Sequence, residues 1–196
     1  MKNPEDLIRQ RGRECASAIE EFCFAEAARV HQTARSLVKT IQEGGKILVA
    51  GNGGSAADAQ HFSAELVNRF LMERRPVPCL ALTTDTSILT SISNDYSYDQ
   101  VFSRQVEALG EEGDALIAIT TSGSSGNIVR ALEKANAQSM LTIGLTGGEC
   151  AQVVHLCDIC LSVAQSSTPR IQEVHHLVLH IIAELVEIML FSHSNA

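Results

Sequence analysis

Two side chains that could bind a metal ion or transfer protons follow the first glycine-rich stretch of the chain. His61 and Glu65 are four residues apart, a spacing that places both on one face of a helix. An imidazole and a carboxylate so arranged suit either two metal ligands or an acid–base pair. The alternative is a surface His–Glu contact without a chemical role.

A second group of candidates lies near the end of the chain, in the stretch "RIQEVHHLVLH". Gln172, His176 and His180 drift by only about 80° around a helix that turns about 100° per residue, so they share one stripe. His175 lies slightly off that stripe. Packing alone does not explain three histidines in an apolar helix, because a buried imidazole needs a partner. The spacing does not select the functional histidine, and one or two are expected to be structural. Mixed imidazole and carboxylate ligands suit zinc, and a glutamine oxygen is a weaker ligand.

Two loops rich in glycine and hydroxyl groups could bind a phosphate. The first, "GNGGS", spans residues 51–55, and the second, "TTSGSSGN", spans residues 120–127. Each follows an apolar stretch and leads into a helix, where glycines let the backbone approach an oxyanion. Either loop alone could be an ordinary strand-to-helix turn. Both at equivalent ends of neighbouring strands would face one crevice, which favours a compact phosphate monoester.

Two other phosphate-binding classes fit less well. Neither loop contains the lysine of the nucleoside triphosphatase motif. Residues 51–56 match the dinucleotide pattern G-x-G-x-x-G/A by letter. However, the acidic residue expected about 20 positions later has only one candidate, Asp85, which comes late. A nicotinamide oxidoreductase is therefore disfavoured.

The elements that must position these residues alternate along the chain. Apolar periodicity and breaker residues predict a helical segment over residues 4–43, in two helices, and then strands alternating with helices. The predicted strands are 46–50, 79–83, 114–121, 141–146 and 159–163, and the later helices are 55–70, 86–94, 99–109, 127–137 and 169–191. This order predicts a single α/β domain with a mainly parallel five-stranded sheet covered on both faces.

The chain as a whole, residues 1–196, is expected to divide into an N-terminal helical arm, 1–43, and an α/β core, 44–196. The arm and the last helix exceed what covering five strands requires, so we expect them to pack against other subunits.

Composition excludes some partners. The chain has 15 Lys and Arg against 23 Asp and Glu, and the net charge of −8 disfavours a surface that coats nucleic acid. The first residues lack a signal peptide's apolar core, and no apolar run approaches the roughly 20 residues that span a bilayer. We therefore expect a cytoplasmic protein without a membrane partner.

The six cysteines, scattered through apolar segments, are expected to be reduced and buried. They are Cys15, Cys23, Cys79, Cys150, Cys157 and Cys160. The last two have C-x-x-C spacing, but in a strand they would point to opposite faces and could not share an ion.

Three stretches together resemble the sugar isomerase (SIS) domain family. They are "GNGGSAADAQHFSAEL", "SNDYSYDQVFSRQVEALGEEGDALIAITTSGSSGN" and "RIQEVHH...H", and the resemblance covers essentially the whole chain. Among its members, the resemblance is to enzymes that convert sedoheptulose 7-phosphate to glycero-manno-heptose 7-phosphate for lipopolysaccharide or other surface heptoses. It also implies a homotetramer with active sites at subunit interfaces.

The resemblance further implies the site residues. One Zn²⁺ per subunit would be bound by His61, Glu65, Gln172 and His180. Substrate contacts would fall on Asn52, Gly53, Gly54, Ser55, Glu65, Asn94, Asp95, Thr120, Thr121, Ser122, Ser125 and Gln172. At Thr120 relatives usually have a serine, and the hydroxyl is retained.

Ketose–aldose isomerisation fits these residue types. A base removes the proton beside the carbonyl, an enediol forms, and an acid returns a proton to the adjacent carbon. Glu65 and His180 are the candidates for that pair, although a residue that binds zinc is not free to act as a base. The phosphate, anchored by the hydroxyl loop, would orient the reacting end.

Rival functions remain on the same fold. A non-catalytic SIS-domain protein could bind a partner such as a replication initiator, but we would expect it to lack the ligating side chains at Glu65 and His180. A sugar-phosphate-sensing regulator is less favoured, because no DNA-binding module is attached.

Overall fold

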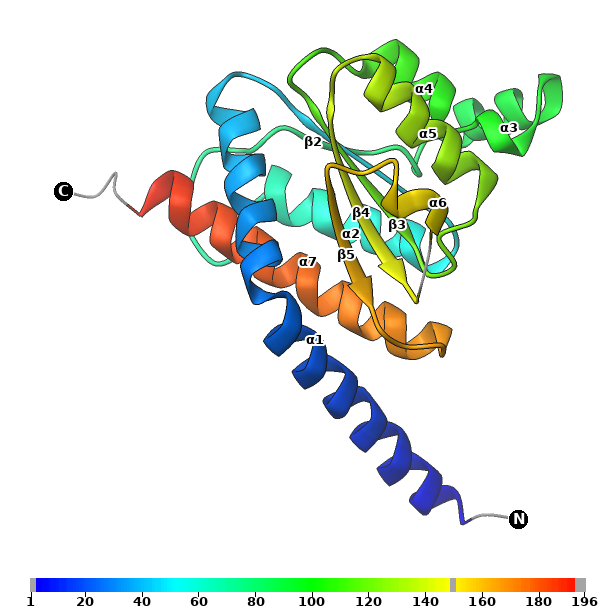
Figure 1. Cartoon of the computed structure of the whole chain (residues 1–196). Coiled ribbons are helices and arrows are strands. Elements are labelled where there is room, and N and C mark those ends of the chain that lie inside the picture. The colour runs from blue at the N-terminus through cyan, green and yellow to red at the C-terminus, as the bar shows by residue number, and fades with distance from the viewer. Residues whose placement is uncertain (1–2, 149–150, 193–196) are drawn as a thin grey trace.

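A five-stranded sheet forms the centre of the protein (Figure 1). The computed structural model describes residues 3–148 and 151–192, and all statements below refer to these. The strand order is β2-β1-β3-β4-β5, and every pair is parallel. The strands are β1 (Ile47–Gly51), β2 (Cys79–Ala81), β3 (Ala115–Thr120), β4 (Leu141–Gly147) and β5 (Ile159–Val163). The predicted α/β class with a parallel five-stranded sheet is confirmed.

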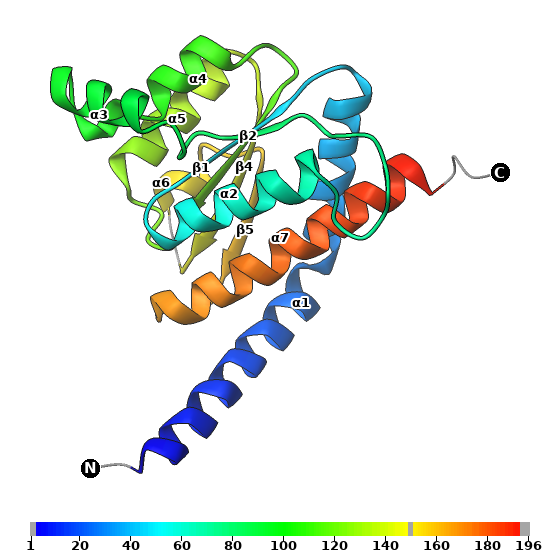
Figure 2. The same ribbon diagram turned by 180° about the vertical axis from the view of Figure 1, so that it is seen from behind.

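Helices cover both faces of the sheet (Figures 1 and 2). On one face α1, α2 and α7 pack against alternate strand residues such as Ile47 and Val49. On the other, helices α3 to α6 pack against the intervening residues, such as Leu48 and Ala50. Every residue of β1 and β3 is buried, as expected for central parallel strands. The helices are α1 (Pro4–Gln42), α2 (Gly54–Val67), α3 (Thr86–Asp95), α4 (Ser103–Leu109), α5 (Gly126–Ala137), α6 (Ala151–Val154) and α7 (Thr168–Phe191).

The N-terminal arm is one continuous helix, so the prediction of two helices is wrong. Helix α1 has 39 residues, with Asn3 accepting a hydrogen bond from the Glu5 N–H at its start. Gly12 lies inside it without ending it, since a single glycine costs a helix only about 1 kcal/mol. Burial begins at Ala18, and the first part of the helix extends away from the sheet (Figures 1 and 2).

Two other segments differ from the sequence-based expectation. The predicted helix 99–109 is split into a 3₁₀ turn, Tyr98–Gln100, followed by α4. Helix α2 ends at Val67 rather than at residue 70. The backbone N–H groups of Phe70, Leu71 and Met72 instead donate to the carboxylate of Glu187 on α7. A distant side chain therefore decides where this helix stops.

Helix α7 is a core helix. Contrary to our expectation, it is long and apolar enough to cross a membrane by length and composition alone. In the fold, however, it packs along α1 and α2 and carries buried residues such as Val178 and Ile182. The same apolar composition is required of a helix that covers a sheet.

The two cysteines of the C-x-x-C stretch do not point to opposite faces as predicted. Cys157 precedes β5, and a Cβ at Gly144 would lie 2.8 Å from its sulfur and 3.6 Å from that of Cys160. Both thiols therefore lie on one side of β4. Burial raises the pKa of the Cys157 thiol to about 12, so it stays protonated and unreactive.

Of the five described cysteines, only Cys79 is buried as expected, and the other four are half-buried. The described cysteines form no disulfide. Cys150 lies outside the described residues, as do residues 1–2 and 193–196 of the predicted domain.

Candidate active site

The two glycine-rich loops lie side by side at the carboxyl ends of neighbouring strands. β1 and β3 pair directly, with Gly51 opposite Ile119, so the loops that follow them share one edge of the sheet. In parallel α/β sheets this edge is where ligands bind. Gly53 and Gly123 have φ values of +56° and +60°, a conformation that side chains other than glycine rarely adopt. The two loops are therefore at the same edge of the sheet, as predicted.

An amide pair joins the two loops. The side chains of Asn52 and Asn127 exchange two hydrogen bonds, each 2.9 Å long. The hydroxyl of Tyr98 donates to the same Asn52 oxygen at 3.1 Å. Asn127 and Tyr98 were not singled out from the sequence, because their partner is 75 and 46 positions away. Since both polar groups of the Asn52 side chain are engaged here, this residue fixes the distance between the loops.

The hydroxyl residues of the second loop divide into two groups. Thr120 is buried, and its hydroxyl accepts a hydrogen bond from the Gly123 N–H at 3.0 Å. It also lies 3.5 Å from the Ser125 hydroxyl. Thr121 is half-buried and Ser122 is exposed, and the Ser122 hydroxyl accepts hydrogen bonds from the Ser124 N–H and hydroxyl groups. Thr120 therefore holds the loop in shape.

The first loop touches the last helix. A Cβ at Gly54 would lie 2.5 Å from the Gln172 side-chain nitrogen, so only glycine leaves room for this amide. A Cβ at Gly51 would lie 2.5 Å from the Ser55 carbonyl oxygen. Gln172 is thus placed beside the predicted phosphate loop.

Three histidines gather where α2 and α7 cross. The Nε2 atoms of His61 and His180 are 2.7 Å apart. The ring of His176 stacks on that of His61 with centroids 4.8 Å apart, and its centroid is 4.5 Å from that of His180. Glu65 approaches His61 with an Nε2–Oε1 distance of 3.6 Å. The predicted grouping of His61, Glu65 and His180 is present in the described chain.

The surroundings of His180 favour its neutral form. Burial lowers the pKa of its imidazole, and the neighbouring His176 and His61 lower it further. On the other side, the Phe70 ring stacks on the His180 ring at 5.5 Å. A neutral imidazole retains the lone pair that a metal ion or a proton requires.

The three histidines could hold a divalent metal ion. One potential ligand atom from each of the three histidines lies within 4.8 Å of the others. Two imidazole nitrogens only 2.7 Å apart must share either a proton or a cation. Imidazole and carboxylate ligands together are typical of zinc sites.

The remaining predicted residues lie elsewhere. His175 is buried, and its Nε2 lies 3.1 Å from the Thr146 carbonyl oxygen. Burial lowers its pKa, so it is one of the expected structural histidines. Asn94 and Asp95 are exposed at the end of α3, where the Asn94 amide donates to the Asp95 carboxylate at 2.8 Å. No described contact connects these two with the loops.

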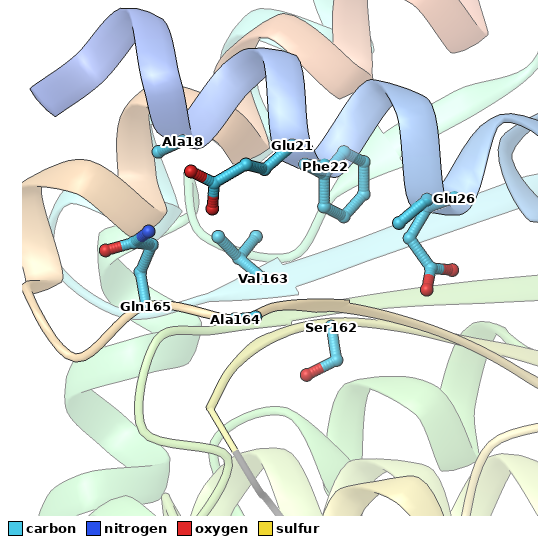
Figure 3. A pocket seen from close by; sticks show the side chains of 9 residues that line it. Ala18, Glu21, Phe22, Glu26, Ser162, Val163, Ala164 and Gln165 are labelled. Atoms are coloured by element: carbon cyan, nitrogen blue, oxygen red, sulfur yellow. The ribbon is translucent and has the colours of Figure 1, made fainter. Parts of the chain in front are cut away.

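A hollow of about 180 Å³ lies on another part of the molecule (Figure 3). It is formed where α1 crosses the end of β5, between Glu21, Phe22 and Glu26 on one side and residues 162–165 on the other. It includes none of the predicted site residues. The candidate active site is therefore the edge of the sheet with the two loops and the histidine cluster.

Comparison with known proteins agrees with this geometry. Residues 12–147 match the family model described as SIS domain. The chain belongs to the SIS domain family. A phosphoheptose isomerase of Thiobacillus denitrificans is 54% identical over 169 residues, which are 85% of this chain and 86% of the relative. A phosphoheptose isomerase of Desulfovibrio desulfuricans is 49% identical over 97% of this chain and 91% of the relative.

A solved structure shares the fold of this SIS-domain chain over nearly its whole length. The phosphoheptose isomerase of Neisseria gonorrhoeae matches with a TM-score of 0.90 and 38% sequence identity. The match covers 94% of this chain and 99% of that one. The predicted family membership is confirmed.

Proposed function

We propose that this protein is a phosphoheptose isomerase that converts sedoheptulose 7-phosphate to glycero-manno-heptose 7-phosphate. The observation that carries the proposal is the convergence of Glu65 and His180 around His61. A chain with a merely partner-binding role would not need this polar cluster. The relatives that support the proposal carry this enzyme's name.

The two loops would bind the sugar phosphate. Backbone N–H groups at the start of a helix attract an anion, and both loops lead directly into helices α2 and α5. The hydroxyl groups of Ser55, Thr121, Ser122 and Ser125 would bind the phosphate oxygens, with Thr120 supporting them from below. Gly53, Gly54, Gln172 and the second N–H of the Asn52 amide would bind the sugar chain, and Glu65 its reacting end. Binding energy from the phosphate would then orient the carbons that react.

Glu65 and His180 would move the protons. One group removes the proton from the carbon beside the ketone, and the other protonates the ketone oxygen, which yields an enediol. The enediol then loses its other hydroxyl proton and gains a proton at the former ketone carbon. No atom is gained or lost overall. The lowered pKa of His180 keeps its imidazole neutral at pH 7, so it can accept a proton.

A Zn²⁺ ion, one per subunit, fits the histidine cluster. Its ligands would be His61, Glu65 and His180, with Gln172 as the fourth ligand that the family resemblance implies. When bound, such an ion polarises a carbonyl and stabilises negative charge on its oxygen. A residue that binds the ion is less available as a base, and this holds for Glu65 and for His180 alike, so both are proposed in the two roles.

We further propose a homotetramer with sites completed at the subunit interfaces. Two observations support it: the first part of α1 extends away from the sheet, and Phe24 on this helix is 92% exposed. Asn94 and Asp95, whose side chains make no described contact with the loops, would reach the site of a neighbouring subunit. The arm 1–43 and the core 44–196 then form one functional unit, residues 1–196. The setting would be cytoplasmic synthesis of lipopolysaccharide or another surface heptose.

The test is an isomerase assay on the purified protein with sedoheptulose 7-phosphate, with and without a chelator. We expect turnover that the chelator removes and zinc restores. Glu65→Gln and His180→Gln should each reduce kcat by about 10²-fold or more, as expected for loss of a proton-transferring group. His31→Ala, an exposed histidine on α1, is the matched control and should be fully active. An inactive wild type that binds a replication initiator would support the non-catalytic alternative.

A further inference from the structure

Tyr98 reaches the first glycine loop from a distant part of the chain, and the family resemblance assigns it no role. Its hydroxyl donates to the Asn52 side-chain oxygen at 3.1 Å. Asn127 donates to the same oxygen at 2.9 Å and accepts a hydrogen bond from the Asn52 side-chain nitrogen at 2.9 Å. A side-chain amide has two lone pairs on its oxygen and two N–H groups. Among the described residues, both lone pairs of Asn52 are therefore used, and one of its N–H groups is left for a ligand.

The amide pair alone does not determine this orientation. Two amides that face each other form two equivalent hydrogen bonds whichever way round both are turned, so the pair could equally leave a lone pair of Asn52 for the ligand. The Tyr98 hydroxyl removes this equivalence. A phenol is a stronger donor than acceptor, because one of its lone pairs is delocalised into the ring. The hydroxyl therefore favours the arrangement in which the Asn52 oxygen faces it.

The segment that carries Tyr98 is itself held against the second loop. Tyr98 and Asp99 belong to the 3₁₀ turn Tyr98–Gln100, which packs against α5. A Cβ at Gly126, the first residue of α5, would lie 2.8 Å from a carboxylate oxygen of Asp99, so glycine leaves room for this contact. The turn thus touches the second loop through Asp99 and the first loop through Tyr98. The position of the hydroxyl is therefore fixed relative to both loops.

We propose that Tyr98 is a positioning residue for sugar-phosphate binding and that it acts through Asn52. Its hydroxyl keeps the Asn52 oxygen engaged, so the amide presents an N–H group to an acceptor oxygen of the sugar chain. Without the hydroxyl both amides of the pair can turn over, and Asn52 then presents a lone pair, which cannot bind that oxygen. The inference rests on the proposed function in placing the sugar chain at the first loop.

Steady-state kinetics with sedoheptulose 7-phosphate tests this role. Tyr98→Phe removes the hydroxyl and keeps the ring, so we expect KM to rise about 3- to 10-fold while kcat stays within about twofold of wild type. An unchanged KM, or a loss confined to kcat, would overturn the proposal.

The chain offers a matched control in its other tyrosine. Tyr98 and Tyr96 are 55% and 56% exposed, and they are the two tyrosines of the chain. The Tyr96 ring lies 4.1 Å from the Arg104 guanidinium, a contact that phenylalanine retains. Its hydroxyl makes no hydrogen bond in the described part of the chain, so Tyr96→Phe should have the KM and kcat of the wild type.

A double-mutant cycle separates action through Asn52 from direct contact with the substrate. In an Asn52→Ala background, Tyr98→Phe should change KM by less than about twofold, because the group that the hydroxyl positions is absent. The same rise in KM in both backgrounds would contradict the proposal, since the two residues would then act independently.

Equilibrium binding separates this result from the proposed function. Heptitol 7-phosphate, in which the ketone of the substrate is reduced to an alcohol, cannot isomerise, and calorimetry measures its Kd. We expect Tyr98→Phe to weaken its binding by about 3- to 10-fold as well. An active wild type whose KM and Kd do not depend on Tyr98 contradicts only the role of Tyr98. An inactive wild type whose affinity for heptitol 7-phosphate falls in Tyr98→Phe supports that role and contradicts the function, and one that neither turns over nor binds contradicts both.

Discussion

Replacement of Glu187 by alanine should destabilise the protein strongly, although the residue is on the far part of α7 from the glycine loops. Its carboxylate accepts hydrogen bonds from the N–H groups of Phe70, Leu71 and Met72 at 2.7, 2.8 and 3.0 Å. It also accepts one from Arg74 Nε at 2.9 Å. The side chains of Glu187 and Arg74 are 1% and 2% exposed, so neither has water as an alternative partner.

The magnitude follows from this geometry. A single hydrogen bond to a charged group contributes about 1.5–3 kcal/mol. The four bonds share one carboxylate and are not additive. Removal of one partner of a buried ion pair costs about 3–5 kcal/mol, because the other charge stays buried without compensation. We therefore expect Glu187→Ala to reduce the free energy of unfolding by about 3–5 kcal/mol.

Urea unfolding at one fixed protein concentration, followed by circular dichroism, measures this loss. The matched control is Glu184→Ala, an exposed glutamate on the same helix, which should change stability by less than about 0.5 kcal/mol. A loss below about 1 kcal/mol in Glu187→Ala would refute the reasoning, since it would mean that the buried contacts are not formed in solution. Phe70 stacks on His180, so the folded variant should also lose isomerase activity.

Three further outcomes follow from the same contacts. Burial raises the pKa of Glu187, but the backbone N–H groups and Arg74 outweigh it and lower the pKa overall. The stabilisation from ionised Glu187 is therefore complete above the ordinary glutamate pKa of about 4.3, and it is lost as the pH falls through the lower pKa of the folded protein. Between pH 6 and pH 3 the urea midpoint should consequently fall less steeply in Glu187→Gln than in the wild type. Gly54→Ala should keep the stability of the wild type but have a kcat/KM lower by about tenfold or more, because the new methyl group displaces the Gln172 amide. Urea unfolding and turnover measured on the same variant check this. Asn127→Ala removes both hydrogen bonds to Asn52, so we expect about 1–3 kcal/mol lower stability by urea unfolding and a raised KM from the looser loops.

Patterns that are local along the chain predicted the fold well. Apolar runs followed by glycine and hydroxyl residues correctly located all five strands. The signal is strongest for the central strands, because a central parallel strand is buried on both faces whatever packs against it. The same patterns placed both loops at one edge of the sheet, since parallel strands end on the same side. Where a segment depended on distant contacts, the predictions failed. Helix α2 stops at Val67 because Glu187 binds the following N–H groups.

The candidate site was predictable in its residue types but not in its arrangement. Four-residue spacing placed His61 beside Glu65, and the stripe on the last helix included both His176 and His180. Only the crossing of α2 and α7 decides that all three imidazoles meet, with His61 and His180 separated by 119 positions in the chain. The same crossing pairs Asp58 with His176, which no spacing rule reveals.

The sequence by itself therefore determined which residues can do chemistry and which strands and loops carry them. Periodicity, glycine turns and side-chain chemistry act over a few residues, and they are readable without the fold. The tertiary structure decided which of these residues touch, because distances between α2, α7 and the two loops depend on how the helices pack on the sheet. It also decided that His175 is structural, bonded to the Thr146 carbonyl, whereas its neighbour His176 joins the cluster. Adjacent residues on a helix point about 100° apart, and packing alone determines which direction is the core and which is the site.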